Sequence, residues 1–114
     1  MEHTLKLQPK YFDFIQHGTK RIELRLNDEK RQQIKPGDTI HFCRLPAEQP
    51  TLTVQVVELL HYPTFAALLA DFDIAILADR GTTKAELLSD LNQFYTATQQ
   101  AHYGVVGIRI QPLS

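Results

Sequence analysis

The sequence has one cysteine, no tryptophan and only two serines among its 114 residues, and these shortages exclude several chemistries. With Cys43 alone, the chain can form neither an internal disulfide nor a multi-cysteine zinc site. Ser89 falls inside a predicted helix and Ser114 is the last residue, so neither occupies the strand-to-helix turn of a serine nucleophile. The five glycines form neither G-x-G-x-x-G nor G-x-x-x-x-G-K-S/T, which excludes both common phosphate-binding loops.

Long apolar segments and an excess of charge are also missing. No run is long and apolar enough to span a membrane, and the N-terminus carries no secretory leader pattern, so we expect a cytoplasmic protein without membrane contact. The formal net charge is −1, which argues against a protein whose whole surface coats a polyanion. The composition fits one globular domain over residues 1–114, and we expect a monomer or a weak homodimer.

Hydrophobic periodicity predicts the element order β-α-β-β-β-α-α-β. Thr83, with Glu86 three positions later, predicts a capping box at the start of one helix, and Pro36-Gly37 fits the centre of a type II turn. Residues 73–81 fit either a strand or a helix. The predicted strands cover residues 1–7, 21–26, 39–44, 51–62 and 105–111, and the predicted helices cover residues 9–17, 64–72 and 83–96, with a further helical turn at 97–102.

The spacing of the strands limits the fold class. Most of them lie in the first half of the chain, too close together for a helix to cross between each pair, which argues against a doubly wound parallel sheet. We therefore expect an α+β fold with a small mixed or mostly antiparallel sheet, curled or closed into a barrel, and helices packed outside it.

Charge is unevenly distributed along the chain. Residues 18–35 carry six of the 12 cationic side chains and a local charge of +3, whereas residues 71–90 carry a local charge of −3. A basic end of this kind attracts anionic ligands. A solvated charged face gives the same pattern, so composition alone leaves both interpretations open.

The strand predicted over residues 21–26 alternates strictly, with Ile22, Leu24 and Leu26 toward a core. Glu23 and Arg25 then share the opposite face. Such a pair can bind a ligand, because the Arg fork suits phosphate or base edges and a Glu accepts from an exocyclic amine. An ordinary cross-strand salt bridge would show the same residues.

Three segments resemble one known family. The octapeptide from Gly18 to Arg25 resembles the G-x-K-x-x-E-x-R signature of the ASCH domain family, in the PUA-like superfamily. Residues 35–42 resemble the G-D-x-I-x-F strand that follows it, and residues 104–110 resemble the closing strand of the family. The resemblance covers essentially the whole chain.

This resemblance implies a small PUA-like β-barrel of about five to six strands with flanking helices. It also implies a cleft that binds RNA or a nucleotide or nucleoside, with Lys20, Glu23 and Arg25 as motif residues. We include Arg21 beside them as a candidate ligand contact, and Asp28 and Arg31 on the following loop, where they would cover the cleft. No cofactor and no metal site are expected.

The tyrosines Tyr95 and Tyr103 are candidates for stacking on a base, although we expect both to lie in the core with an exposed hydroxyl.

Two alternatives to a binding module remain. One branch of the family hydrolyses N4-acetylated cytidine with the motif Lys, a Thr and a separate Glu; Lys20 matches that Lys, but Glu23 occupies the Thr position. If the chain is an enzyme, Lys20 and Glu23 are the catalytic candidates. Another branch cleaves RNA with a divalent metal, toward which Glu23 and Asp28 would contribute. A plain interaction domain that meets an acidic protein is the last hypothesis.

Overall fold

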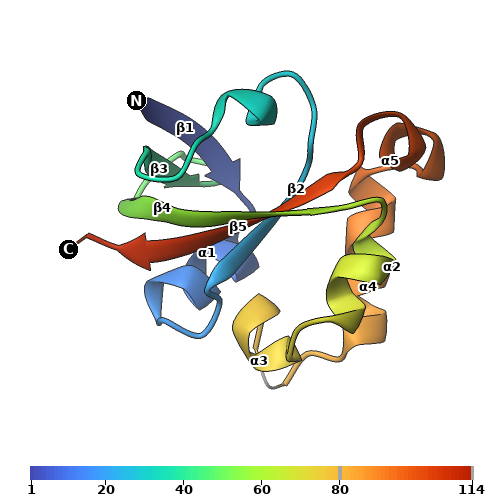
Figure 1. Cartoon of the computed structure of the whole chain (residues 1–114). Coiled ribbons are helices and arrows are strands. Elements are labelled where there is room, and N and C mark those ends of the chain that lie inside the picture. Colours follow the sequence, from blue (N-terminus) through green and yellow to red (C-terminus); the bar gives the residue numbers. More distant parts are fainter. Residues whose placement is uncertain (80, 114) are drawn as a thin grey trace.

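Five strands form one mixed sheet in the order β1-β3-β4-β5-β2 (Figure 1). The computed structural model describes residues 1–79 and 81–113, so Arg80 and Ser114 lie outside the described residues. Strands β1 and β3 are parallel and the other neighbours are antiparallel. The strands are β1 (Glu2–Leu7), β2 (Ile22–Leu26), β3 (Thr39–Arg44), β4 (Thr51–Tyr62) and β5 (Val105–Pro112).

The helices α2 to α5 gather at one side of this sheet, and α1 lies apart from them (Figure 1). The predicted α+β class is confirmed, and the five strands follow in the predicted order, but four helices, α2 to α5, stand before the last strand where the predicted order has two. The ambiguous segment contains the short helix α3, which Asp73 caps by accepting a hydrogen bond from Ala75 N at 2.9 Å. The helices are α1 (Pro9–Gln16), the 3-10 turn η1 (Arg31–Gln33), α2 (Phe65–Ala70), α3 (Ile74–Leu77), α4 (Lys84–Phe94) and α5 (Ala97–Tyr103).

The capping prediction was half right. Thr83 Oγ1 accepts a hydrogen bond from Glu86 N at 3.1 Å, but the Glu86 carboxylate binds the Thr83 hydroxyl instead of its backbone N–H. The complete capping box lies at the start of α5, where Thr96 and Gln99 each accept a hydrogen bond from the other's backbone N–H. This second box was not identified from the sequence.

The curl of the sheet is shown by a contact between its two edges. Strands β1 and β2 are the outermost strands of the order, yet Arg25 Nη2 of β2 donates a hydrogen bond to the Lys6 carbonyl of β1 at 2.8 Å. The sheet therefore bends into an open half-barrel, with a side chain spanning the seam between β1 and β2. The expected barrel is present in this open form.

The hydrophobic interior is divided into two clusters. The barrel core lies inside the curled sheet and contains Phe12, Phe42 and Ile108, and the helical core lies between the sheet and the later helices and contains Phe65 and Leu87. Burial of apolar surface in both clusters supplies the main stabilising free energy of the fold. The seam between β1 and β2 lies where these two cores meet.

Strand β2 is buried along its whole length. Ile22 and Leu24 pack in the helical core, as the alternation predicts. Glu23 and Arg25 lie on the opposite face, but that face is also covered, and these two side chains are enclosed within the protein. Alternation identified the two faces correctly and did not show that both are buried.

Gly107 in β5 allows the sheet to approach the helical core closely. A Cβ atom at this position would lie 3.1 Å from Ile22 Cγ2 and 3.2 Å from Leu68 Cδ1. We expect Gly107→Ala to lower the free energy of unfolding by about 1–3 kcal/mol through overpacking, as measured by urea denaturation. Gly81→Ala is the matched control, because its nearest contact would be an ordinary 3.7 Å to Asp79 Oδ1. Equal losses in the two variants would contradict this prediction.

Candidate functional site

A pocket of about 200 Å³ opens at the seam between β1 and β2. Lys20, Glu23 and Arg25 line one side of it, and these side chains are among the few buried polar residues of the described chain. Another part of the lining is apolar and aromatic and comes mainly from α4 and the residue that follows it; it consists of Leu87, Leu91, Phe94 and Tyr95. The pocket therefore combines a charged cluster with an apolar and aromatic surface.

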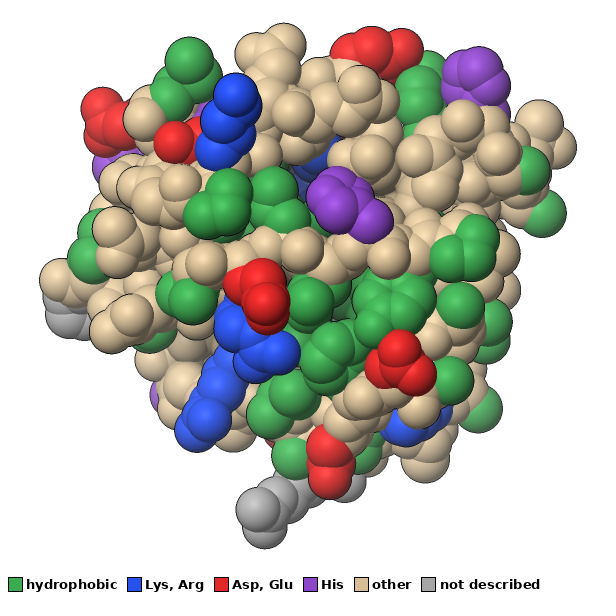
Figure 2. Space-filling view, in the orientation of Figure 1, with side chains coloured by type: hydrophobic (Ala, Val, Ile, Leu, Met, Phe, Trp, Pro, Cys, Tyr) green, Lys and Arg blue, Asp and Glu red, His purple; other side chains and the backbone are tan. Residues whose placement is uncertain are grey.

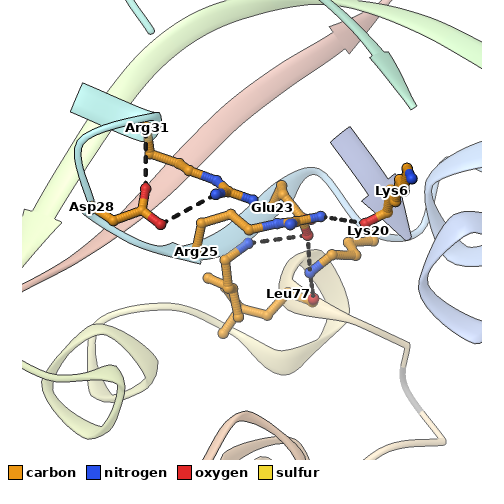
Figure 3. Close-up of polar contacts among 8 residues, drawn as sticks. Lys6, Lys20, Glu23, Arg25, Asp28, Arg31 and Leu77 are labelled. Atoms are coloured by element: carbon orange, nitrogen blue, oxygen red, sulfur yellow. Dashed lines mark hydrogen bonds and ion pairs between the residues drawn. The ribbon is translucent and has the colours of Figure 1, made fainter. Parts of the chain in front are cut away.

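Glu23 and Arg25 form a fixed pair within this cluster (Figure 3). The two residues are separated by one position on β2, so their side chains share a face, and Arg25 Nε donates to Glu23 Oε2 at 2.8 Å. The other carboxylate oxygen, Oε1, accepts from Leu24 N at 3.1 Å. Arg25 also reaches the Lys6 carbonyl, so three anchors hold the guanidinium and carboxylate in place.

The Lys20 side chain reaches the same pocket as Glu23 and Arg25. Lys20 lies three positions before Glu23, so the alternation of a strand would place it on the other face. It lies before β2 begins, and its long side chain carries Nζ to 2.7 Å from the Leu77 carbonyl at the end of α3. Nζ also lies 3.7 Å from Glu23 Oε1 and 5.5 Å from the centre of the Tyr11 ring. The relative exposures of Lys20, Glu23 and Arg25 are only 3%, 3% and 9%.

Burial has the largest effect on the pKa of Lys20. It lowers the pKa of the Lys20 ammonium from 10.5 to about 8, against the opposing effect of the Glu23 carboxylate. The pKa of Arg25 is raised, because the effect of Glu23, helped by Tyr95, exceeds the opposing effect of burial. At neutral pH the cluster thus holds two cations and one anion, which leaves one positive charge without a buried counter-charge.

The aromatic side of the pocket was largely missed from the sequence. Phe94 has the spacing of a core residue on its helix but is 55% exposed at the rim of the pocket. Tyr95 lines the pocket beside it, with the two ring centres 6.4 Å apart. Tyr11 also lines the pocket, and its hydroxyl donates to Asp90 at 2.7 Å; burial, together with this hydrogen bond, raises the pKa of Tyr11. No sequence pattern distinguishes these rings from core aromatics.

The structure does not bring the remaining candidates into the pocket. Arg21 is exposed and borders a separate hollow near the end of β5. Asp28 and Arg31 form their own ion pair at 3.2 Å, and Figure 3 draws no hydrogen bond or ion pair between these two residues and the Glu23 cluster. Asp28 and Arg31 also do not line the pocket.

The other side chains that the sequence could not place also lie outside the pocket. The His41 ring lies 2.7 Å from Glu2 and 3.2 Å from Thr53 on the sheet, and His61 is exposed on β4. Tyr103 donates its hydroxyl to Glu29 at 3.1 Å. Within residues 1–79 and 81–113, no three His, Cys, Asp or Glu side chains cluster as metal ligands do, and no helix in that range is long and apolar enough to cross a membrane.

A curled mixed sheet with flanking helices and a polar pocket at its open seam defines a PUA-like α+β domain. The profile of the ASCH domain family matches residues 5–114, and the chain belongs to this family. The crystal structure of hypothetical protein PH0355 is similar, with 36% identity, a TM-score of 0.87 and coverage of 99% of this chain and 100% of that one.

A second structure supports the same conclusion. The solution NMR structure of protein PF0455 from Pyrococcus furiosus has 34% identity and a TM-score of 0.79, and the match covers 100% of this chain and 99% of that one. No curated protein matches the chain. The family and fold expected from the three sequence segments are thereby confirmed.

The lowered pKa of Lys20 gives a measurable titration. Between pH 8 and 10.5 the native state binds fewer protons than the unfolded state, so this group makes the free energy of unfolding rise with pH across that window. In protein labelled with 13C-lysine, the Lys20 Cε resonance should titrate near pH 8. Glu23→Gln removes the charge that raises this pKa, so the midpoint should move lower. Lys20→Arg identifies the signal, and a midpoint near 10.5 would contradict the buried position of the ammonium.

Proposed function

We propose that the chain is a binding module whose pocket holds the base of a nucleoside, a nucleotide or a single-stranded RNA. The observation that carries this proposal is the buried Lys20–Glu23–Arg25 cluster, which lines one small pocket together with an aromatic and apolar surface. A nucleobase has matching chemistry, because its edges carry hydrogen-bonding atoms and its faces stack on aromatic rings.

The size of the pocket limits what enters it. Its volume of about 200 Å³ lies below the range of roughly 300–1,000 Å³ that is typical of sites for drug-sized ligands. The pocket therefore suits one base, with the sugar and any phosphate outside. An RNA ligand would bind through a base that is unstacked from its neighbours, as sequence-specific readers of single-stranded RNA bind theirs.

The distribution of surface charge favours recognition of a base over general electrostatic attraction of nucleic acids. On the face seen in Figure 2, basic and acidic side chains are interspersed and no patch of a single sign appears. At the pocket itself, the exposed Lys6 pairs with Glu48 at 3.2 Å. We therefore expect few phosphate contacts, and an RNA affinity that depends only weakly on salt because the slope follows the number of phosphates bound.

The first experiment is an amide NMR titration with uridine, cytidine, their mononucleotides and a short single-stranded RNA. Shifts should be confined to the residues that line the pocket. Phe94→Ala should weaken binding by about 1–3 kcal/mol, because it removes a stacking surface. It should change the free energy of unfolding by less than about 0.5 kcal/mol, because the ring is already 55% exposed.

Leu113→Ala is the control for this variant, since Leu113 is 53% exposed and does not line the pocket. Equal effects of Phe94→Ala and Leu113→Ala on affinity would contradict the proposed site. If no nucleoside and no RNA shifts any resonance, the binding proposal fails, and an interaction domain for a protein partner becomes the better hypothesis.

Hydrolysis of an N4-acylated cytidine is the second candidate, and the lowered pKa of Lys20 favours it. A lysine with a pKa of about 8 has a far larger neutral fraction at physiological pH than an ordinary lysine, and a neutral amine can act as a base or a nucleophile. The metal-dependent ribonuclease hypothesis has no comparable support, because Glu23 and Asp28 each pair with an arginine that competes with a metal cation.

The hydrolase candidate predicts turnover of N4-acetylcytidine to cytidine and acetate, with a rate that rises as pH increases through about 8. Lys20→Arg and Glu23→Gln should abolish turnover, while binding of the substrate persists. Chromatography of the nucleosides measures the reaction directly. Absence of cytidine after prolonged incubation with stoichiometric protein would exclude this activity and leave the binding proposal intact.

A further inference from the structure

The buried side of the pocket has hydrogen-bond donors to spare. Lys20 Nζ carries three N–H groups, of which one binds the Leu77 carbonyl, and Glu23 Oε1 lies at the longer distance of 3.7 Å. Arg25 uses Nε on Glu23 and Nη2 on the Lys6 carbonyl. None of the side-chain hydrogen bonds of the described residues assigns a partner to Arg25 Nη1, and Tyr95, which helps to raise the pKa of Arg25, lies beside the guanidinium.

Each buried acceptor atom at the charged side of the pocket already accepts one hydrogen bond from the protein. Glu23 Oε1 accepts from Leu24 N, and Oε2 accepts from Arg25 Nε. The Lys6 carbonyl accepts from Arg25 Nη2, and the Leu77 carbonyl accepts from Lys20. At the pocket wall, the Tyr95 hydroxyl and the side-chain amide of Gln8 can each donate or accept a hydrogen bond. Both carboxylate oxygens of Glu23 are thus engaged by the protein, and through Oε2 the carboxylate positions Arg25.

The balance of charge in the pocket also favours a ligand that offers an acceptor atom. Lys20 and Arg25 bring two positive charges against the single negative charge of Glu23, and all three groups are almost fully buried. An uncompensated charge in a low-dielectric site is costly until an electron-rich group approaches it. A ligand oxygen directed at Lys20 and Arg25 would satisfy both the charge and the free N–H groups.

We propose that this pocket selects bases that present a keto oxygen, uracil and guanine, over the amino bases cytosine and adenine. This inference rests on the proposed function and specifies its ligand. Uracil presents O4, and guanine presents O6 with N7, as acceptors that an Arg or Lys can bind, whereas cytosine and adenine present an exocyclic amine. In this pocket the amine would set donors against donors and leave them unpaired, at a cost in affinity. On this proposal Glu23 positions Arg25, whereas the sequence-based hypothesis assigned it the role of accepting from such an amine.

The test compares uridine with cytidine, which differ at C4, where uracil has O4 and cytosine an amino group, and at N3, which carries a hydrogen only in uracil. Isothermal titration calorimetry on the unmodified protein should give uridine an affinity on the order of ten- to a hundredfold higher than that of cytidine. Guanosine and adenosine form a second pair with the same expected direction if the pocket admits a purine. Equal binding within the uridine–cytidine pair, or tighter binding of cytidine, overturns the inference.

Two variants separate edge recognition from stacking. Arg25→Lys removes the guanidinium fork, so the ratio of uridine to cytidine affinity should fall several-fold. Phe94→Ala should weaken both nucleosides by the same factor and leave this ratio unchanged, because stacking tolerates any base. If Arg25→Lys does not fold, the comparison on the unmodified protein still decides the question.

The remaining outcomes separate this inference from the proposed function. If UMP and CMP bind equally and the free nucleosides do not bind, a phosphate anchors the ligand and the keto preference is wrong. If some nucleosides bind but show no preference, only the inference fails. If no nucleoside, nucleotide or RNA binds, the proposed function itself is wrong.

Discussion

The ion pair between Glu23 and Arg25 is the contact on which the arrangement of the site depends. The barrel has its two edge strands, β1 and β2, at the seam, and the Arg25 guanidinium spans the gap by binding Glu23 on its own strand and the Lys6 carbonyl on the other. A closed barrel would satisfy these edges with backbone hydrogen bonds and leave no pocket. Here a side chain joins the edges, and the space beside it is open to a ligand.

The same pair explains why Lys20 can be buried. An isolated ammonium in the protein interior is expensive, and the Glu23 carboxylate and the Leu77 carbonyl offset only part of that cost, which is why the pKa of Lys20 falls to about 8. Burial outweighs the attraction of Glu23 because the helices α3 and α4 cover the site, and no local spacing reveals that cover.

Local chemistry predicted most of the fold from the sequence. The Pro36-Gly37 turn is present, with a hydrogen bond from Asp38 N to the Lys35 carbonyl and a φ of 92° at Gly37, because this turn depends only on adjacent residues. The strand periodicity of residues 22–26 likewise gave the correct faces. The motif residues Lys20, Glu23 and Arg25 meet as expected, since a strand of known period fixes two of them. Arg21, Asp28 and Arg31 lie elsewhere, because the path of a turn or a loop is set by tertiary contacts.

The features that were missed share one physical origin. Phe94 occupies a helical position that looks apolar and inward, yet α4 ends there and its last turn projects past the helical core to the rim of the pocket. The backbone carbonyls of Lys6 and Leu77 contribute to the site, and such a backbone contribution cannot be predicted from the residue type. Replacing a buried charged cluster with apolar side chains of similar volume is often neutral or stabilising for a fold. A cluster with a net positive charge, unused donors and an adjacent opening is therefore better explained by a ligand that completes it than by the stability of the barrel.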